Sequence, residues 1–256
     1  MSTYNISSVA ASVASMLGVP APEHASPAYA PLADRKMDRV LLYNPDAVAL
    51  WLYEKYKDIF TPVTDRIEME LPSHSFMPSV TPVCFGSMYT GAEPAVHGIQ
   101  KYEKPIITIE TLFDVLIKAG KKPAIVSATP TCSISKIFLD RKMDYYIFTS
   151  LDRVNETALK LMEEDKYDLI TVYNGNYDST MHKNGPEAEV SLNALRHNTN
   201  MYAKLYDHAK KVWAGKNWAM GFCPDHGCHE IDGECGSHGL DTYEDMNVIH
   251  FWGFGK

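Results

Sequence analysis

The sequence predicts an α/β fold, a sandwich with helices on both faces of a mostly parallel central sheet, in one domain that spans residues 1–256. Short apolar runs that suit buried strands alternate along the chain with longer segments that suit helices. The chain has no internal repeat, low-complexity tract or strong linker, so a single domain is the simplest account of its 256 residues.

The alternation begins with the apolar run Arg39–Asn44, which indicates a buried strand that ends just before Asp46. Residues 47–56 are largely apolar and suit a buried helix better than an amphipathic one. A second helix is expected to begin near Thr108, as its cap, and to stop at Gly120. Strands are then expected at residues 123–127 and 145–148.

The second half of the chain repeats this pattern. Residues 152–164 indicate a helix and residues 168–173 a strand. A long helix is expected over residues 186–214, with a proline in its first turn, where a missing N–H costs little. Residues 218–223 suit a further strand. Ligands of such sheets bind at the carboxyl ends of the strands, which selects the loops at Asp46, 174–182 and 224–238.

Composition and charge exclude several classes of protein. The net charge of −8 works against a broad nucleic-acid-binding face. No stretch approaches the ~18 consecutive apolar residues of a membrane span, and the apolar segment 8–19 lacks the basic residues that precede a signal-peptide core. Five cysteines, an odd number, fit reduced thiols. We therefore expect a cytoplasmic protein with no membrane partner and no stable nucleic-acid binding.

Histidine is concentrated in one part of the chain, since six of the ten lie between His182 and His238 inclusive. Asp178 and His182 are four residues apart, so a helical turn or a tight loop can bring both to one ion. Asp225 and His226 directly follow a predicted strand, and His238 is a third candidate histidine. Aspartate with histidine suits zinc, manganese or iron better than calcium or magnesium, because imidazole is a borderline ligand.

Each of these patterns alone is weak evidence for a metal site. An aspartate four residues before a histidine is common, and Asp-His-Gly is also an ordinary turn. A rival set, Cys228, His229, Cys235 and His238, offers a structural zinc knuckle, although its spacing departs from paired Cys-x-x-Cys ligands. His229 is otherwise either a donor that supports the site or an exposed loop residue. The aspartate and histidine set is favoured because both of its parts follow predicted strands.

Six segments of the chain resemble one family. They are PSVTP at 78–82, YTG at 89–91, HGI at 97–99, YDSTMHKNGP at 177–186, DHG at 225–227 and HG at 238–239. In this order they resemble the alkaline phosphatase superfamily, above all its type I phosphodiesterase/nucleotide pyrophosphatase group and the related phosphonoacetate hydrolases. The resemblance implies a three-layer sandwich in a small, cap-less version, since only 11 residues separate His226 from His238.

The resemblance also implies two bound divalent metal ions, with zinc as the first choice and manganese or iron as alternatives. Six side chains would hold them in two groups: Asp178, His182 and His238, and Asp46, Asp225 and His226. The nucleophile, Thr81, would reach towards the ion of the second group. Many relatives place glycine after the first aspartate of that group, whereas this chain has Ala47.

In this family-like reaction Thr81 attacks phosphorus, and water then hydrolyses a covalent phospho-threonine intermediate. A helix N-terminus at Thr81 would favour the phosphoryl group, and a capping hydroxyl is the structural alternative. The expected function is a two-metal-dependent hydrolase of phosphate esters, acting on phosphodiester or nucleotide pyrophosphate bonds of a small phosphorylated substrate. The alternatives are a phosphomonoesterase or phosphonate hydrolase and, in another class, a non-catalytic zinc-binding domain.

The order of the chain departs from the family in one respect. Residues 6–22 resemble a small helix that follows the last histidine in many relatives, but here they open the chain. Residues 247–255 resemble the strand that precedes this helix in the relatives. We therefore expect a circularly permuted layout with the two chain ends close in space.

Overall fold

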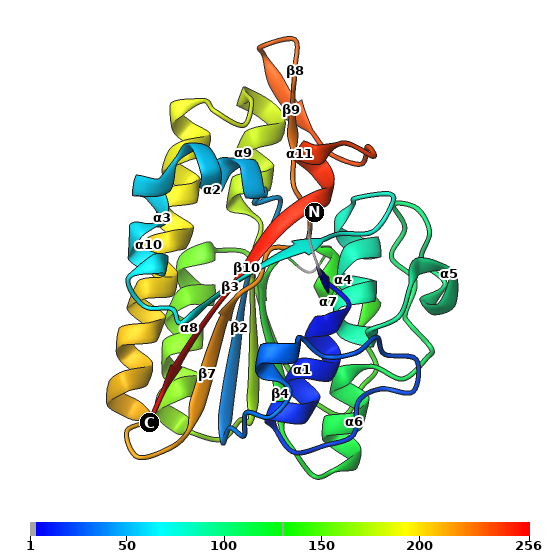
Figure 1. The fold of residues 1–256 in the computed structure, drawn as a ribbon, viewed down its shortest axis with the longest axis vertical. Coiled ribbons are helices and arrows are strands. Elements are labelled where there is room, and N and C mark those ends of the chain that lie inside the picture. The colour runs from blue at the N-terminus through cyan, green and yellow to red at the C-terminus, as the bar shows by residue number, and fades with distance from the viewer. Residues whose placement is uncertain (1–3, 130) are drawn as a thin grey trace.

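Residues 4–129 and 131–256 are described by a computed structural model, in which eight strands form one central sheet (Figure 1). In chain order its strands are β1 (Tyr4–Asn5), β2 (Arg39–Pro45), β3 (Met69–His74), β4 (Pro123–Ala128), β5 (Asp144–Phe148), β6 (Leu169–Asn174), β7 (Trp218–Phe222) and β10 (Asn247–Gly255). Across the sheet the order is β1-β3-β10-β7-β2-β6-β4-β5, and β10 runs antiparallel to both neighbours whereas the other described pairs are parallel. The predicted mostly parallel sheet is confirmed.

Helices cover both faces of this sheet (Figure 1). One face carries α1 (Ser8–Met16), α4 (Thr81–Thr90), α6 (Leu112–Lys118) and α7 (Ser133–Ile137). The other carries α2 (Leu50–Lys55), α3 (Lys57–Thr64), α8 (Leu151–Glu164), α9 (Asn176–Asn184) and α10 (Glu189–Val212). Successive strand side chains point to opposite faces, so Leu42 joins the first apolar core and Leu41 the second. The predicted three-layer sandwich is confirmed.

Shorter elements lie around this frame. They are η1 (Ala30–Leu32), α5 (Pro94–His97), α11 (Tyr243–Met246) and the hairpin of β8 (His229–Ile231) and β9 (Cys235–Ser237). The hairpin projects beyond the sheet (Figure 1). It makes up most of the short segment between His226 and His238, which is too short for a large cap. Over residues 4–129 and 131–256, no helix combines the length and the apolar character needed to cross a bilayer.

The first predicted helix begins at Leu50 rather than Ala47. Ala47 has a φ of 63°, in the left-handed region, so the chain turns sharply there instead of entering a helix. The predicted helix also ends early, because Tyr56 leaves the helical region with a ψ of 52° and α3 follows as a separate helix. The sharp turn at Ala47 is what directs Asp46 into the centre described below.

Two further helix starts differ from the prediction. Thr111, not Thr108, caps α6: Thr111 Oγ1 accepts the Asp114 N–H at 3.3 Å, and Asp114 Oδ2 accepts the Thr111 N–H at 2.9 Å. This reciprocal pair is a capping box, which satisfies two N–H groups at once. The helix α10 begins at Glu189 rather than at Pro186, after an extended residue.

The sequence does not predict β3. Its run contains Glu70 and Pro72, residue types that are rare in the interior of a sheet. Nevertheless β3 pairs with β10 along its whole length, from His74 opposite Asn247 to Met69 opposite Trp252. The long partner strand, rather than local propensity, defines this element.

The predicted closeness of the two chain ends is wrong. Tyr4 of β1 pairs with Ser73, and Ser73 pairs with Val248 near the start of β10. Gly255, at the other end of β10, pairs with Trp218. A nine-residue strand spans about 30 Å at 3.3 Å per residue, so β1 and the C-terminus lie at opposite ends of β10 (Figure 1).

Candidate metal centre

Three neighbouring strands, β7, β2 and β6, end at one edge of the sheet and position most of the candidate ligands. Asp46 directly follows β2, and Asp225 and His226 follow β7 after a short turn. Asp178 lies in the first turn of α9, which follows β6. Because parallel strands end at the same edge, residues far apart in the sequence meet there.

The inner group is Asp46, Asp225 and His226, and all three residues are buried. His226 Nε2 lies 3.3 Å from Asp46 Oδ1 and 3.4 Å from Asp225 Oδ2. Tetrahedral ligands that each lie about 2.0–2.1 Å from zinc are about 3.3–3.4 Å from one another. The spacing of the inner group therefore suits a single zinc-sized ion.

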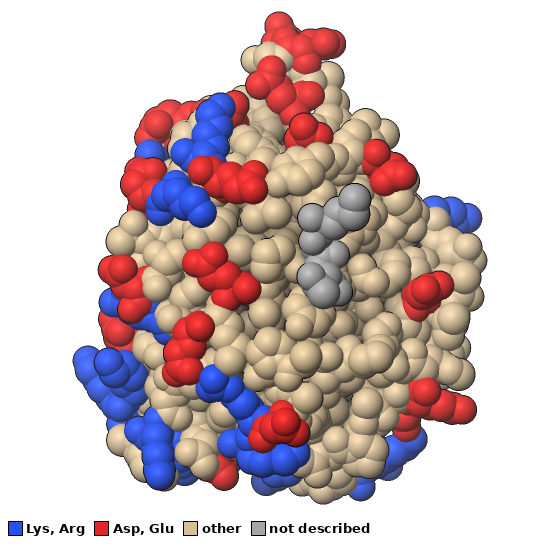
Figure 2. Space-filling model, viewed as in Figure 1, with Lys and Arg blue, Asp and Glu red and all other residues tan. Residues whose placement is uncertain are grey.

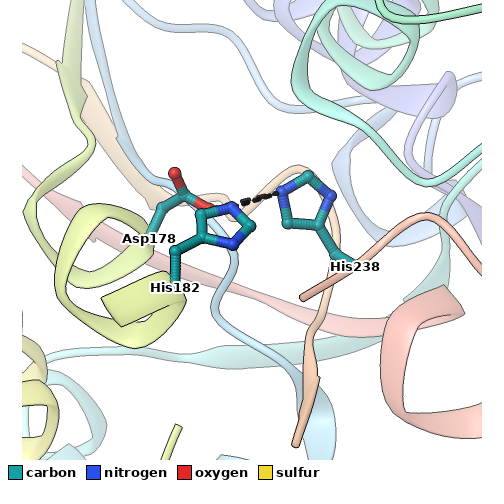
Figure 3. Close-up of side chains that lie close together, drawn as sticks. All are labelled: Asp178, His182 and His238. Atoms are coloured by element: carbon teal, nitrogen blue, oxygen red, sulfur yellow. Dashed lines mark hydrogen bonds and ion pairs between the residues drawn. The ribbon is translucent and has the colours of Figure 1, made fainter. Parts of the chain in front are cut away.

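The outer group is Asp178, His182 and His238, whose side chains converge in Figure 3. It is more exposed than the inner group. Asp178 Oδ1 is 3.1 Å from His182 Nε2 and 3.4 Å from His238 Nε2. The rings of His238 and His226 have centroids 4.1 Å apart, so the two groups are adjacent. The structure thus brings together all six predicted ligands, in the two sets that the resemblance implies.

The histidine rings are oriented by their second nitrogen. In each case Nδ1 donates to a backbone carbonyl at 2.9–3.0 Å: His182 to Gly236, His226 to Gly227 and His238 to Ser79. A carbonyl can only accept, so in the neutral ring the proton is on Nδ1 and Nε2 presents a lone pair. All three lone pairs face the carboxylates, which is how metal-binding histidines are commonly held.

Three buried carboxylate oxygens have no hydrogen-bond partner among the described residues: Asp46 Oδ1, Asp178 Oδ1 and Asp225 Oδ2. Each of them faces a histidine Nε2 that carries no proton while the ring is neutral. Buried carboxylate oxygens without a donor are costly unless a cation or a proton neutralises them. A borderline divalent cation in each group would satisfy the oxygens and the nitrogens together, so the residues present fit a two-metal centre.

Without a cation the two carboxylates of the inner group favour their protonated form. Burial raises the pKa of Asp46, and the neighbouring Asp178 carboxylate raises it further. Burial and then the charge of Asp46 raise the pKa of Asp225 well above its usual value. Burial also acts on Asp178, but the contacts with His182 and His238 outweigh it and hold that pKa low. Protons therefore compete with metal ions for the inner group.

Thr81 is the first residue of α4 and lies against the inner group. Its side chain is buried, and Thr81 Oγ1 is 3.4 Å from both Asp46 Oδ2 and His226 Nε2. The first-turn N–H groups of a helix have no intrahelical acceptor and form its positive end. The hydroxyl thus lies where a phosphoryl group would meet both the ligands and the helix N-terminus.

Tyr173 is a site residue that the sequence does not single out. Its hydroxyl donates to Asp46 Oδ2 at 2.5 Å from the neighbouring strand β6. Burial, followed by the charge of Asp46, raises the pKa of Tyr173 well above its usual value, so the hydroxyl remains a donor.

Ala47 adopts the left-handed backbone conformation that glycine would adopt more readily, and its N–H donates to Asp225 Oδ1 at 3.4 Å.

The rival zinc knuckle is not assembled. Among the described residues, no group of three or more clustered candidate ligands contains a cysteine. Cys228 is buried with its Sγ 3.7 Å from the Tyr177 hydroxyl, and Cys235 lies on β9. His229 contacts Asp245 instead of a ligand group. The geometry therefore favours the aspartate and histidine groups over the cysteine set.

Acidic side chains gather at the tip of the β8–β9 hairpin. Figure 2 shows Asp and Glu at the tip of the β8–β9 hairpin, whereas Lys and Arg gather mainly towards the opposite end of the molecule on this face. With a net charge of −8, the surface alone would repel an anionic substrate. Any attraction has to come from cations held in the centre.

No family model and no curated protein matches the sequence. An inactive threonine-to-alanine variant of murine ectonucleotide pyrophosphatase/phosphodiesterase 5, in complex with AMP, matches with 16% identity and a TM-score of 0.57, over 75% of this chain and 57% of that chain. A second structure of the same murine protein matches over the same shares with 16% identity and a TM-score of 0.55.

The C-terminal periplasmic domain of the phosphoethanolamine transferase EptC from Campylobacter jejuni matches with 12% identity and a TM-score of 0.62, over 86% of this chain and 80% of that chain. These likenesses, all below 25% identity, show the fold alone: the chain shares its α/β sandwich with these phosphodiesterase and phosphoethanolamine transferase structures. The chain spans 57% of the length of the murine structures that it matches.

Proposed function

With an alkaline phosphatase-like fold as the premise, we propose that this chain is a two-metal-dependent hydrolase of phosphate esters. The observation that carries the proposal is the pairing of the inner and outer groups at one sheet edge, with Thr81 against the inner group. Three carboxylates facing two divalent ions leave a locally positive centre, which supports an anionic substrate despite the acidic surface.

The two groups would each hold one ion, which we propose to be zinc, with manganese or iron as alternatives of the same donor preference. When bound, the ions supply positive charge to the phosphoryl oxygens and lower the pKa of the attacking hydroxyl. The protein holds the ligands ready for this task, because the Nδ1 hydrogen bonds of the three histidines fix their Nε2 lone pairs.

Thr81 is the proposed nucleophile. Its Oγ1 forms a bond to phosphorus while the bond to the leaving oxygen breaks, and Asp46 Oδ2, 3.4 Å away, is a nearby acceptor for the hydroxyl proton. The product of this step is a phospho-threonine at the N-terminus of α4, where the positive end of the helix dipole favours the phosphoryl oxygens. Water then attacks phosphorus from the opposite face, the bond to Thr81 breaks, and the hydroxyl regains a proton.

Phosphodiester or nucleotide pyrophosphate bonds are the proposed substrates. The motif around Thr81 resembles that group of enzymes, and the murine structures of similar fold are named as a nucleotide pyrophosphatase/phosphodiesterase, one of them with AMP. The short hairpin between His226 and His238 supports an open site that accepts extended or varied substrates. A phosphomonoesterase or a phosphonate hydrolase uses the same centre and is the alternative.

We also propose a small phosphorylated molecule, rather than a nucleic acid or a membrane, as the binding partner, and the cytoplasm as the location. The net charge of −8 supports the first part. The five cysteines are free of disulfides in the structure, which supports the cytoplasmic location. Fractionation of cells that express the chain tests the location directly.

The test of the proposed function is hydrolysis of four matched aryl esters by the zinc-loaded protein: a phosphate monoester, a phosphate diester, a phosphonate and a sulfate. We expect the phosphate diester to be turned over fastest and a chelator to abolish the reaction. Protein that contains two ions but hydrolyses no phosphate ester, or that prefers the sulfate, would overturn the proposal.

A further inference from the structure

The two ligand groups are attached to the fold in different ways. The inner group lies just after the ends of β2 and β7, and its residues are at most 1% exposed. The outer group depends on the β8–β9 hairpin, because His238 directly follows β9, and the side chain of His182 is 39% exposed. The outer group therefore needs something that fixes the hairpin.

The hairpin positions both histidines of the outer group. His182 Nδ1 donates to the carbonyl of Gly236 on β9 at 3.0 Å. Gly236 packs so closely on α9 that a Cβ there would lie 2.4 Å from Met181 Sδ. A shift of the hairpin would thus move His238 and release the hydrogen bond that orients His182.

One buried carboxylate closes the hairpin at its base. Asp245, on α11, is fully buried. Its Oδ1 lies 2.7 Å from His229 Nδ1 at the start of β8, and its Oδ2 accepts the N–H of Leu240 at 2.8 Å, shortly after His238. A single side chain therefore joins the two segments of chain that enter and leave the hairpin.

The backbone of Asp245 has a separate contact with the inner group. Its carbonyl accepts the N–H of Gly227 at 2.8 Å, next to His226. This contact does not involve the carboxylate, so a side-chain substitution at Asp245 leaves it in place. The side chain and the backbone of one residue thus serve different groups.

We propose that the Asp245 carboxylate is a positioning residue that clamps the base of the hairpin and thereby sets the affinity of the outer group for its metal ion, without setting that of the inner group. The inference rests on the proposed two-metal function. Loss of a residue that orients metal ligands typically weakens metal binding by about 10–100-fold. The expected effect is therefore selective weakening at one of two sites.

The experiment is a calorimetric zinc titration of the metal-free protein and its variants, with circular dichroism to verify folding. Wild type is expected to bind two ions. Asp245→Ala should weaken one site by about 10–100-fold and change the other by less than about twofold. Asp245→Asn should recover part of the loss, because its amide can still accept from Leu240 and donate to the other tautomer of His229.

Two background variants assign the weakened site. With Asp225→Ala, which disables the inner group, Asp245→Ala should still weaken the remaining site. With Asp178→Ala, which disables the outer group, Asp245→Ala should have no effect on the remaining site. The opposite assignment would overturn the inference.

The matched control is Thr242→Ala. Thr242 Oγ1 accepts the N–H of Asp245 at 3.3 Å and caps α11, and among the described residues no hydrogen bond joins this side chain to the hairpin. Thr242→Ala should lower stability and leave both zinc affinities unchanged. If it weakens zinc binding as much as Asp245→Ala does, the stability of α11, and not the clamp, sets the affinity of the outer group. If Asp245→Ala does not fold, His229→Ala removes one arm of the clamp at a partly exposed residue and should weaken the same site to a smaller extent.

The outcomes separate this inference from the proposed function. Wild type that binds no zinc contradicts the two-metal proposal itself. A second outcome contradicts only the role of Asp245. In that outcome wild type binds two ions, but folded Asp245→Ala binds both as tightly as wild type or loses both equally.

Discussion

His182 Nε2 and His238 Nε2 lie 3.1 Å apart, although each ring donates from its opposite nitrogen, Nδ1, to a backbone carbonyl. Two lone pairs at this distance repel each other unless a positive charge lies between them. Asp178 Oδ1 faces the same point from 3.1 Å and 3.4 Å. The outer group is therefore built around a cation or a shared proton, which makes metal binding the first property to measure.

Removal of one carboxylate should remove one ion. Asp178→Ala deletes the only carboxylate of the outer group and Asp225→Ala a buried oxygen of the inner group, so each variant should retain one ion where wild type retains two. Metal analysis after gel filtration measures this. Cys228→Ser is the control, because Cys228 belongs to neither group. Loss of an ion from Cys228→Ser would instead favour the cysteine knuckle.

Thr81→Ala should abolish turnover and leave the metal content intact. The substitution removes the nucleophile but none of the six ligands of the two groups, and we expect a loss of at least about 10³-fold, as for other enzymes that lose their nucleophile. Thr81→Ser keeps a hydroxyl and should retain much of the activity. Steady-state hydrolysis with parallel metal analysis checks the pair, and undiminished turnover by Thr81→Ala would remove Thr81 from the mechanism.

His250 predicts how stability depends on pH. It is fully buried between Tyr29 and Pro224, and burial lowers its pKa from 6.5 to about 4. As the pH falls from about 6.5 to 4, the unfolded chain binds this proton before the folded protein does. The free energy of unfolding should therefore decrease over this interval, by about 3 kcal/mol from this group.

Urea unfolding between pH 4 and 7 measures this dependence. His250→Gln should be less stable than wild type at neutral pH. Its free energy of unfolding should fall less steeply on acidification, because the group that takes up the proton is gone. His24→Gln, at an exposed histidine, should leave the slope as in wild type. An unchanged slope in His250→Gln would mean that His250 is not the group that resists protonation.

Gly227→Ala should damage both stability and the inner group. A Cβ at this position would lie 1.9 Å from the Glu244 carbonyl oxygen and 3.0 Å from Ala49 Cβ, so the backbone beside His226 has to move. We expect destabilisation of about 3 kcal/mol, the upper part of the range for overpacking, together with loss of one ion.

The matched glycine is Gly120, which has a φ of 76°. A Cβ added there would meet no other part of the described chain within 4 Å, so this position has backbone strain without a clash. Gly120→Ala should destabilise by about 1 kcal/mol and keep both ions. Chemical denaturation and metal analysis compare the two variants. Equal effects at both positions would mean that the close approach at Gly227 has no special role.

The candidate ligands could be predicted because each lies in a short local pattern. Asp46 and Asp225 follow apolar runs that are recognisable as strands, and Asp178 and His182 have helical spacing. The sheet order then brings these loops together, since β7, β2 and β6 are neighbours. Local sequence therefore placed these candidates in loops at the ends of regular elements, and the family resemblance divided the six ligands into two groups.

The residues that support the ligands could not be predicted in this way. Asp245 lies between Glu244 and Met246 in a four-residue helix, and its burial arises only when the hairpin and the chain at Gly227 fold over it. Tyr173 resembles an ordinary strand residue until β6 lies beside β2, because its contact joins it to Asp46, 127 residues away in the sequence. Contacts of this kind arise from the tertiary fold, so no local pattern indicates them.

The central claim is that the chain binds two metal ions, one in each group. A crystal of the zinc-loaded protein, measured at the zinc absorption edge, tests it most directly through the anomalous difference map. We predict two peaks per chain, one among Asp178, His182 and His238 and one among Asp46, Asp225 and His226. A map with no peak at either group, or with its peak at Cys228 and Cys235, would contradict the claim.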